Sequence, residues 1–142
     1  MATRKKGVEF VKHITELIAK SNGFESHLKK VKILDGGDGT CTAEVKVGAE
    51  HVNFYNFLHG GYIVTLVNTI STYALMSKPS HPGVSVDLSV NYLTGAKLGD
   101  EIVVEARLSK VGKYLAFIDC TVKHKKDDSV IAKATHLKYV NL

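Results

Sequence analysis

The first segment of the chain has apolar residues at the spacing of a helix. Between about residues 3 and 20 they recur three or four positions apart, with charged side chains between them. These apolar residues are Val8, Val11, Ile14, Leu17 and Ile18. The spacing predicts one amphipathic helix docked on a core. We expect it to end at residues 21–23, because the Asn and Gly there accept the left-handed backbone found at helix ends.

A second helix is predicted in the middle of the chain, and it is almost entirely apolar. From His59 to about Ser77 the apolar residues again follow a helical spacing, and the residues between them are small and uncharged. A helix with so little charge is expected to be buried. Pro79 and Pro82 are expected to end it, since proline cannot continue a helix.

The remaining segments alternate apolar and polar residues with a period of two, which is typical of strands with one buried face. Residues 31–33 and 41–47 flank a glycine-rich turn at 35–39 and predict a hairpin. Four more alternating runs follow the apolar helix, at 84–92, 102–108, 115–120 and 130–136. Because the connections are short, we expect neighbouring runs to pair as antiparallel strands.

Together these elements predict an α+β fold, in which one long central helix lies across a curved antiparallel sheet and an N-terminal helix precedes it. The length of 142 residues fits a single domain over residues 1–142. A sheet of this kind has free edge strands, which favours a dimer that continues the sheet.

Composition narrows the class of protein. With 44% hydrophobic and 23% charged residues, the chain has the make-up of a soluble globular protein. Its longest apolar stretches fall well short of the ~18 residues that cross a bilayer, so we expect no transmembrane segment and no secretory signal. Cys41 and Cys120 both lie inside apolar alternating runs, and we expect them to be reduced. The compartment stays open between cytoplasm and mitochondrion.

The charge balance suits an anionic partner. Lys and Arg total 19 against 14 Asp and Glu, giving a net charge of +5. The positive residues are dispersed, and arginine, the preferred reader of nucleic-acid bases, occurs only at Arg4 and Arg107. Nucleic acid is therefore not the expected partner. No His, Cys and carboxylate cluster has metal-ligand spacing, so we expect no metal.

The candidate chemistry lies where the apolar helix begins, at Gly60 and Gly61, directly after His59. The first N–H groups of a helix have no partner within the helix, and with the helix dipole they favour negative charge. Such a terminus can polarise a carbonyl oxygen. The alternative is structural: the two glycines only form a tight corner, and His59 is an ordinary core histidine.

Several motifs in a fixed order resemble those of hotdog-fold acyl-CoA thioesterases, and the resemblance covers nearly the whole chain. The motifs are His59-Gly60-Gly61 opening an apolar helix, Pro82-Gly83-Val84-Ser85-Val86-Asp87, Tyr92 with Ala96-Lys97-Leu98-Gly99, Lys110-Val111-Gly112-Lys113, and Leu115-Ala116-Phe117. The resemblance implies hydrolysis of medium- or long-chain fatty acyl-CoA to fatty acid and CoA, within fatty acid metabolism. It also implies a homodimer, or a homotetramer, and no cofactor apart from the CoA of substrate and product.

The resemblance assigns roles to individual positions. The Gly60 N–H is expected to polarise the thioester carbonyl, while Asn53 and His59 position the thioester or order the loop. Ser85 matches the serine that orients water, across the dimer interface from the helix. The acyl tail is expected along the helix near Tyr62, Ile63 and Leu66 and near the aromatic residues 54–57, unless these residues are simply core.

One position departs from the family. The catalytic carboxylate expected nine residues after His59 is here Asn68. An amide is neutral and essentially non-basic, so it neither activates water nor attacks a carbonyl well. Asp87, on the face of Ser85, and Glu50 are the candidate replacements. Asn68 marks either a disabled variant prepared to trap a ligand or a natural relative that binds acyl-CoA with little turnover.

The resemblance also implies a CoA site in which lysines and a close backbone approach at a glycine hold the phosphates. The matching residues are Ser85, Asp87, Tyr92, Leu93, Thr94, Gly95, Ala96, Lys97, Lys110, Val111, Gly112, Lys113, Tyr114, Leu115 and Tyr139. The alternative for the lysines is a solvated turn. Two other functions remain open: an inactive acyl-CoA-binding protein, and a hotdog dehydratase or hydratase.

Overall fold

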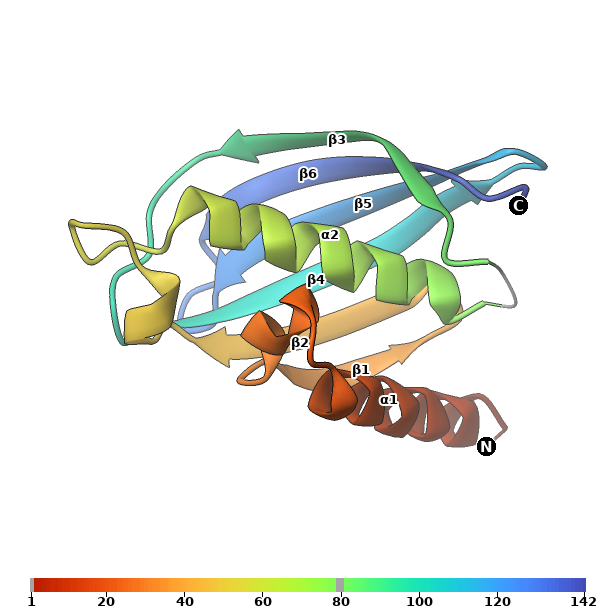
Figure 1. The fold of residues 1–142 in the computed structure, drawn as a ribbon, viewed down its shortest axis with the longest axis horizontal. Coiled ribbons are helices and arrows are strands. Elements are labelled where there is room, and N and C mark those ends of the chain that lie inside the picture. Colours follow the sequence, from red (N-terminus) through yellow and green to blue (C-terminus); the bar gives the residue numbers. More distant parts are fainter. Residues whose placement is uncertain (1, 79–80) are drawn as a thin grey trace.

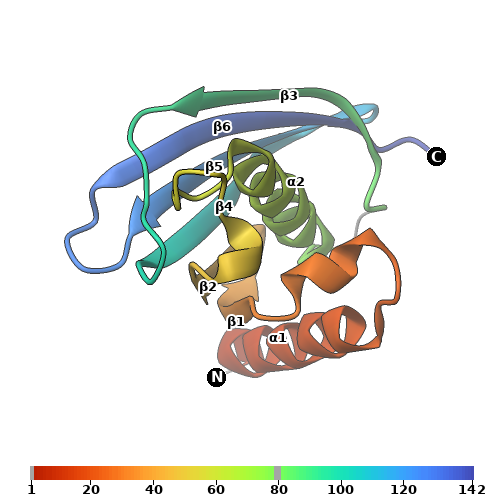
Figure 2. The ribbon, with the colours of Figure 1, turned by 60° about the vertical axis from the view of Figure 1, so that its left-hand side comes forward.

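The computed structural model describes residues 2–78 and 81–142, and in these residues six strands form one antiparallel sheet. The order across the sheet is β1, β2, β4, β5, β6, β3. Their bounds are β1 Lys32–Gly37, β2 Thr40–Lys46, β3 Val84–Tyr92, β4 Glu101–Val111, β5 Leu115–His124 and β6 Val130–Tyr139. The sheet curves around one long helix, α2 (Gly60–Met76), which lies across its inner face (Figures 1 and 2).

The helix α1 (Ala2–Lys20) packs beside β1 at the opposite edge of the sheet from β3 (Figure 2). Its Ile14 and Ile18 are buried, as the helical spacing predicts, whereas Val8 and Leu17 of the predicted apolar face are exposed. Two short 3₁₀ helices, η1 (Phe24–Leu28) and η2 (Ala49–His51), were not predicted from the sequence. The order of helix, hairpin, apolar helix and four strands is confirmed, and with it the α+β class.

The burial of α2 follows from its composition. Leu66, Val67 and Ile70 are fully buried, and α2 contacts β4, β5 and β2. The helix begins at Gly60, with His59 as its N-cap, and ends at Met76. Pro79, expected to end it, lies outside the described residues. No helix in the described part of the chain is long and apolar enough to cross a membrane.

The first hairpin is tighter than its sequence predicts. Strand β1 continues through the glycines to Gly37, and only Asp38 and Gly39, both with positive φ, form the turn. At Gly36 the strand has room only for a glycine, because a side chain there would overlap the ring of Phe10 on α1. The glycine run is thus strand that allows the first helix to approach closely.

The expectation that successive strands are neighbours is wrong for β3 and β4. Strand β3 lies at the edge beside β6, whereas β4 lies between β2 and β5. The connecting segment, residues 93–100, crosses the end of the sheet and is anchored on both sides. The Leu93 N–H donates to the Ile131 carbonyl, and the Leu58 N–H donates to the Ala96 carbonyl, each at 2.8 Å.

Both cysteines are buried and free, as expected from their positions in apolar runs. Cys41 lies on β2 and Cys120 on β5. Burial raises the pKa of each thiol to about 12. Both therefore act as small apolar core residues rather than as nucleophiles.

Candidate active site

The start of α2 presents one backbone N–H without a protein partner. The His59 Nδ1 accepts the Gly61 N–H at 2.8 Å, and the His59 carbonyl accepts the N–H groups of Tyr62 and Ile63. In the described part of the chain, the Gly60 N–H donates no hydrogen bond. This N–H, at the positive end of the helix dipole, is therefore free to donate a hydrogen bond to a ligand. The side chain of His59 acts as the helix cap.

Asn53 organises the loop that leads to this helix. Its Oδ1 accepts the N–H groups of Tyr55 (2.9 Å) and Phe57 (3.2 Å). Because the amide oxygen is occupied, its two N–H donors are what the side chain can offer a ligand. Of the two roles expected from the resemblance, ordering the loop fits these contacts, and positioning the thioester stays a prediction for Asn53.

The segment after β3 lies against the same helix start. The Tyr92 hydroxyl donates to the Gly60 carbonyl at 3.1 Å, and its ring lies next to the Gly60 Cα. Lys97 pairs with Phe57 in an isolated β-bridge, and the Leu98 N–H donates to the Asn56 carbonyl. The structure thus brings the predicted CoA residues 92–97 together with Asn53, His59 and Gly60.

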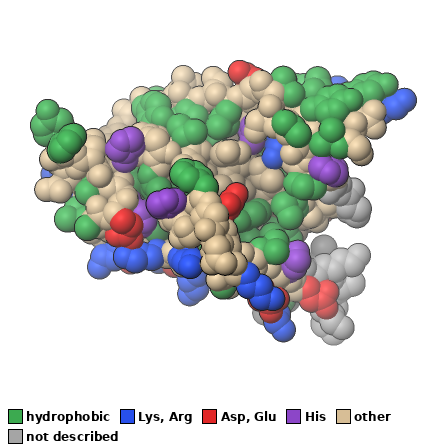
Figure 3. All heavy atoms as spheres, in the orientation of Figure 1, with side chains coloured by type: hydrophobic (Ala, Val, Ile, Leu, Met, Phe, Trp, Pro, Cys, Tyr) green, Lys and Arg blue, Asp and Glu red, His purple; other side chains and the backbone are tan. Residues whose placement is uncertain are grey.

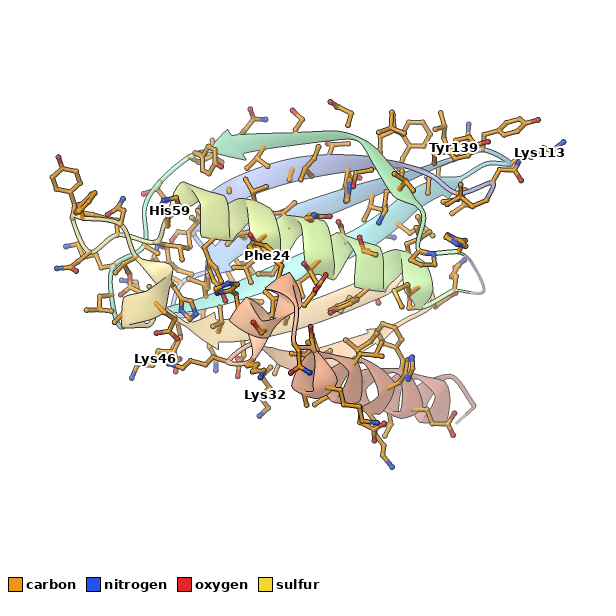
Figure 4. The ribbon with its side chains drawn as sticks, viewed as in Figure 1. Phe24, Lys32, Lys46, His59, Lys113 and Tyr139 are labelled. Atoms are coloured by element: carbon orange, nitrogen blue, oxygen red, sulfur yellow. The ribbon has the colours of Figure 1, made fainter. Side chains whose placement is uncertain are left out.

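Lys113 and Tyr139, two of the other predicted CoA residues, lie at the end of the protomer opposite His59 (Figure 4). Lys110 lies at the end of β4 and Lys113 in the β4–β5 turn. This turn meets the end of β6, where the rings of Tyr114 and Tyr139 stack with their centroids 6.4 Å apart. Strand β3 connects the two ends, and its nine residues span about 27 Å. One protomer therefore does not bring all the predicted CoA residues into one site.

Ser85 is linked to α2 of its own protomer through a histidine that the sequence analysis missed. Its Oγ lies 2.7 Å from Nε2 of His136 on β6, and Nδ1 of this ring lies 2.7 Å from Oγ of Ser71 on α2. His136 is fully buried. A sequence signal existed, because His136 takes an inward position in line with Ala132 and Ala134, where an apolar residue is expected. The resemblance, by contrast, predicted that Ser85 lies across a subunit boundary from this helix.

A β-bulge sets the direction of Ser85. Ser85 is aligned with Lys138, while Asp87 is aligned with the next residue of β6, Leu137. Successive residues of a strand face opposite sides, so Ser85 faces inward with Lys138 and Asp87 faces outward. The expectation that Ser85 and Asp87 share a face is therefore wrong, and Asp87 does not replace the missing carboxylate.

Lys138 is a buried cation beside this histidine. Its side chain is 4% exposed, and its Nζ donates to Oγ1 of Thr72 on α2 at 2.7 Å. Among the described residues, no carboxylate forms a salt bridge with it. Burial lowers the Lys138 pKa to about 8. Burial, and then the charge of Lys138, lower the His136 pKa to about 4, so the imidazole is neutral at neutral pH.

Acid should destabilise the protein through His136. Its pKa is about 4 when folded and about 6.5 in an unfolded chain, so the unfolded state binds the proton first as the pH falls. The ring faces Lys138 on its own strand, and α2 and β3 meet it with the hydroxyls of Ser71 and Ser85. Between pH 6.5 and 4 this group should remove about 3 kcal/mol of stability. Urea unfolding of the unmodified protein and of His136→Gln, at pH 6.5 and pH 4, measures this loss. The free energy of unfolding of the variant should fall by about 3 kcal/mol less than that of the unmodified protein.

Asn68 lies on the exposed face of α2, two turns beyond Gly60. Its backbone carbonyl accepts the hydroxyls of Ser71 (3.1 Å) and Thr72 (2.8 Å). Glu50, the second candidate replacement, is paired with Lys30 at 2.6 Å on η2, and this contact lowers its pKa. Its carboxylate is therefore engaged in a surface ion pair, and nothing in this geometry favours Glu50 as the replacement.

In the single protomer, the residues expected along the acyl tail are divided between the core and the surface. Ile63 and Leu66 are buried in the core beneath α2, so they are core residues here. Tyr62 stacks on His51, while Phe54 and Tyr55 are exposed at the loop tip. A groove of about 1030 Å³ lies elsewhere, between α1, β1 and the end of α2.

Comparison with known proteins gives consistent matches. The family model "Thioesterase superfamily" matches residues 55–131. Human acyl-coenzyme A thioesterase 13 is 37% identical over 131 residues, which cover 92% of this chain and 94% of the human protein. The zebrafish thioesterase superfamily member 2 crystal structure has a TM-score of 0.88 at 39% identity, covering 92% of this chain and 95% of that one. A Streptococcus pneumoniae hypothetical thioesterase, crystallised with coenzyme A, has a TM-score of 0.80 at 26% identity, covering 90% and 94%.

Proposed function

The chain belongs to the thioesterase superfamily, and from this premise we propose that it hydrolyses medium- to long-chain fatty acyl-CoA at a low steady-state rate. The observation that carries the proposal is the unpartnered Gly60 N–H at the start of a buried helix. A donor at that place polarises a thioester carbonyl and stabilises the oxyanion formed by attack on it. Carbonyl polarisation and proton transfer need only protein groups and water, so we propose no metal or redox cofactor.

Two expectations drawn from the sequence motifs are confirmed by the comparisons. The fold is that of the hotdog thioesterases, because the zebrafish structure superposes over nearly the whole chain. The specific resemblance of the motifs to acyl-CoA thioesterase 13, or thioesterase superfamily member 2, is also confirmed. Thioester hydrolysis is accordingly the reaction class of its named relatives.

We propose that the complete site forms between two copies of the chain. Ser85 is linked through the His136 ring to Ser71, which is about 16 Å along α2 from Gly60, too far for Ser85 and Gly60 of one protomer to act on one thioester. Strand β3 is at the sheet edge, with Val84 and Val86 each 57% exposed, and hydrophobic side chains gather over this edge (Figure 3). A copy paired antiparallel along β3 brings the Ser85 end of one strand to the Tyr92 end of the other, next to Gly60 of the partner subunit. A dimer, or a tetramer made of two such dimers, is the expected assembly.

Mixing two inactive variants tests this shared site. Gly60→Pro and Ser85→Ala should each be nearly inactive alone. If Gly60 of one subunit works with Ser85 of the other, random mixing by joint refolding should restore about a quarter of the unmodified rate, because half the dimers are mixed and each has one intact site. Sedimentation equilibrium measures whether the mixed sample is dimeric. Absence of any recovery in verified mixed dimers places each site within one protomer and contradicts the proposal.

The same pairing supplies the CoA site from both ends of β3. It brings Lys110 and Lys113 of one subunit toward residues 92–97 of the other, where positive charge can meet the CoA phosphates. Changing Lys110 and Lys113 together to Glu should weaken CoA binding by about 10-fold or more, with a loss that shrinks at high salt. Isothermal titration at two salt concentrations measures it. Lys20→Glu combined with Lys29→Glu, remote from this site, is the matched control. An unchanged Kd for CoA in the Lys110 and Lys113 variant would show that this loop does not bind CoA.

A second candidate function is kept because of Asn68. Without a carboxylate at that position, the protein is either a slow hydrolase or a protein that binds acyl-CoA without turnover. A steady-state assay across acyl-CoA chain lengths, with thiol release as the signal, separates them. Turnover dependent on Gly60 supports hydrolysis, whereas stoichiometric binding with no thiol release supports the binding function.

A further inference from the structure

Resting on the proposed function, we infer that Ser85 is the nucleophile of a slow thioester cleavage and that His136 is its general base, so that an acyl group is carried on Ser85. The usual carboxylate position holds Asn68, and neither Asp87 nor Glu50 replaces it. The inward-facing hydroxyl of Ser85, 2.7 Å from a buried imidazole, is the activated group that the chain presents instead.

The direction of the hydrogen bonds fits this role. The Ser71 hydroxyl donates its single hydrogen to the Asn68 carbonyl at 3.1 Å, so toward the ring it is an acceptor. The His136 proton therefore lies on Nδ1 and points at Ser71, which leaves Nε2 as the acceptor of the Ser85 hydroxyl. A hydroxyl hydrogen-bonded to the free nitrogen of an oriented imidazole is the arrangement that activates a serine nucleophile.

The burial of the ring identifies Ser85, rather than water, as the attacking group. His136 is fully buried, with Nδ1 facing Ser71 and Nε2 facing Ser85. Ser85 itself is exposed at the β3 edge. His136 can therefore accept a proton at Nε2 only from the Ser85 hydroxyl and not directly from water.

The steps balance without a further reactant. The Ser85 proton passes to Nε2 of His136 as Oγ bonds to the thioester carbon, whose oxygen is held by Gly60 of the partner subunit. The C–S bond then breaks, and the CoA sulfur takes the proton from Nε2. Water later cleaves the ester, returning the hydrogen to Ser85 and releasing the fatty acid.

The ester should accumulate. The Ser85 hydroxyl contacts Nε2 directly during ester formation, whereas the water that cleaves the ester has poor access to this buried nitrogen. Cleavage of the ester is then slower than its formation. The structure thus predicts a burst of about one CoA per site, followed by a slow steady state.

Rapid quench with octanoyl-CoA, followed by intact-protein and peptide mass spectrometry, tests this inference. We expect an octanoyl adduct on the peptide that contains Ser85, absent in Ser85→Ala and formed at least ~10²-fold more slowly in His136→Gln. Ser71→Ala, which leaves the Ser85–His136 contact in place, should slow it by a smaller factor. His13→Gln and Ser26→Ala, away from the site, are matched controls, and circular dichroism verifies folding.

The outcomes separate this inference from the proposed function. Turnover without an adduct, with His136→Gln as fast as the unmodified protein, overturns the inference and leaves the hydrolase intact. If the protein shows neither turnover nor an adduct, the inference is overturned. If Asn68→Asp is nevertheless active, the result supports the second candidate function, binding of acyl-CoA without turnover. Inactivity of Asn68→Asp as well overturns the proposed function too.

Discussion

Replacing Gly60 with proline should lower kcat for acyl-CoA hydrolysis by about 10²–10³-fold while the protein stays folded. The change removes the N–H and puts the ring Cδ of proline in the place of its hydrogen, so the carbonyl oxygen loses its donor. Gly60 is the first residue of α2, a position where proline is well tolerated because that N–H has no helical partner. His59, with φ −65° and ψ 132°, already has the extended backbone that a residue before proline requires.

The matched control for this substitution is Gly60→Ala, which keeps the N–H. A methyl group there would meet the Tyr92 ring at 3.5 Å, an ordinary contact. We expect the alanine variant to retain most of the activity. If both variants lose activity equally, the loss comes from crowding beside Tyr92 and the Gly60 N–H is not the donor. Thermal unfolding of both checks that α2 is intact.

Replacing Asn68 with aspartate should raise steady-state hydrolysis by at least ~10²-fold, because it restores a base that can activate water directly. The position is exposed on α2, so the change should cost little stability. Its carboxylate would also bypass the slow ester step, and the burst of CoA should disappear. Steady-state and pre-steady-state thiol release measure both effects.

Asn68→Ala is the control for that experiment. If Asn68 contributes no activation, the alanine variant should hydrolyse acyl-CoA about as slowly as the unmodified protein. Equal rates for the aspartate variant and the unmodified protein would show that this position is not where water is activated.

The helices and most strands could be predicted because their periodicity is local. The spacing of apolar residues in α2 reports directly which face is buried, and it identified the helix to within a residue at each end. The pairing of β3 could not be predicted that way. The segment of residues 93–100 is short, yet it crosses the end of the sheet. Strand β3 is held beside β6 by contacts between residues remote in sequence, such as Leu93 and Ile131.

The bulge in β3 explains what the sequence missed in the site. Strict alternation places Ser85 with Asp87 on the polar face, but one extra residue in the strand turns Ser85 inward to His136. Nothing in the residues around Val86 signals this shift. The Gly60 site was accessible from sequence because a helix start has unpaired N–H groups whatever surrounds it.

A crystal structure with a ketone analogue of acyl-CoA, in which a methylene replaces the sulfur, tests the central claim most directly. The account predicts the analogue between two subunits, with its carbonyl oxygen about 2.9 Å from the Gly60 nitrogen of one and its carbon facing Ser85 of the other. A carbonyl bound away from the start of α2, or an analogue held within one protomer, would contradict it.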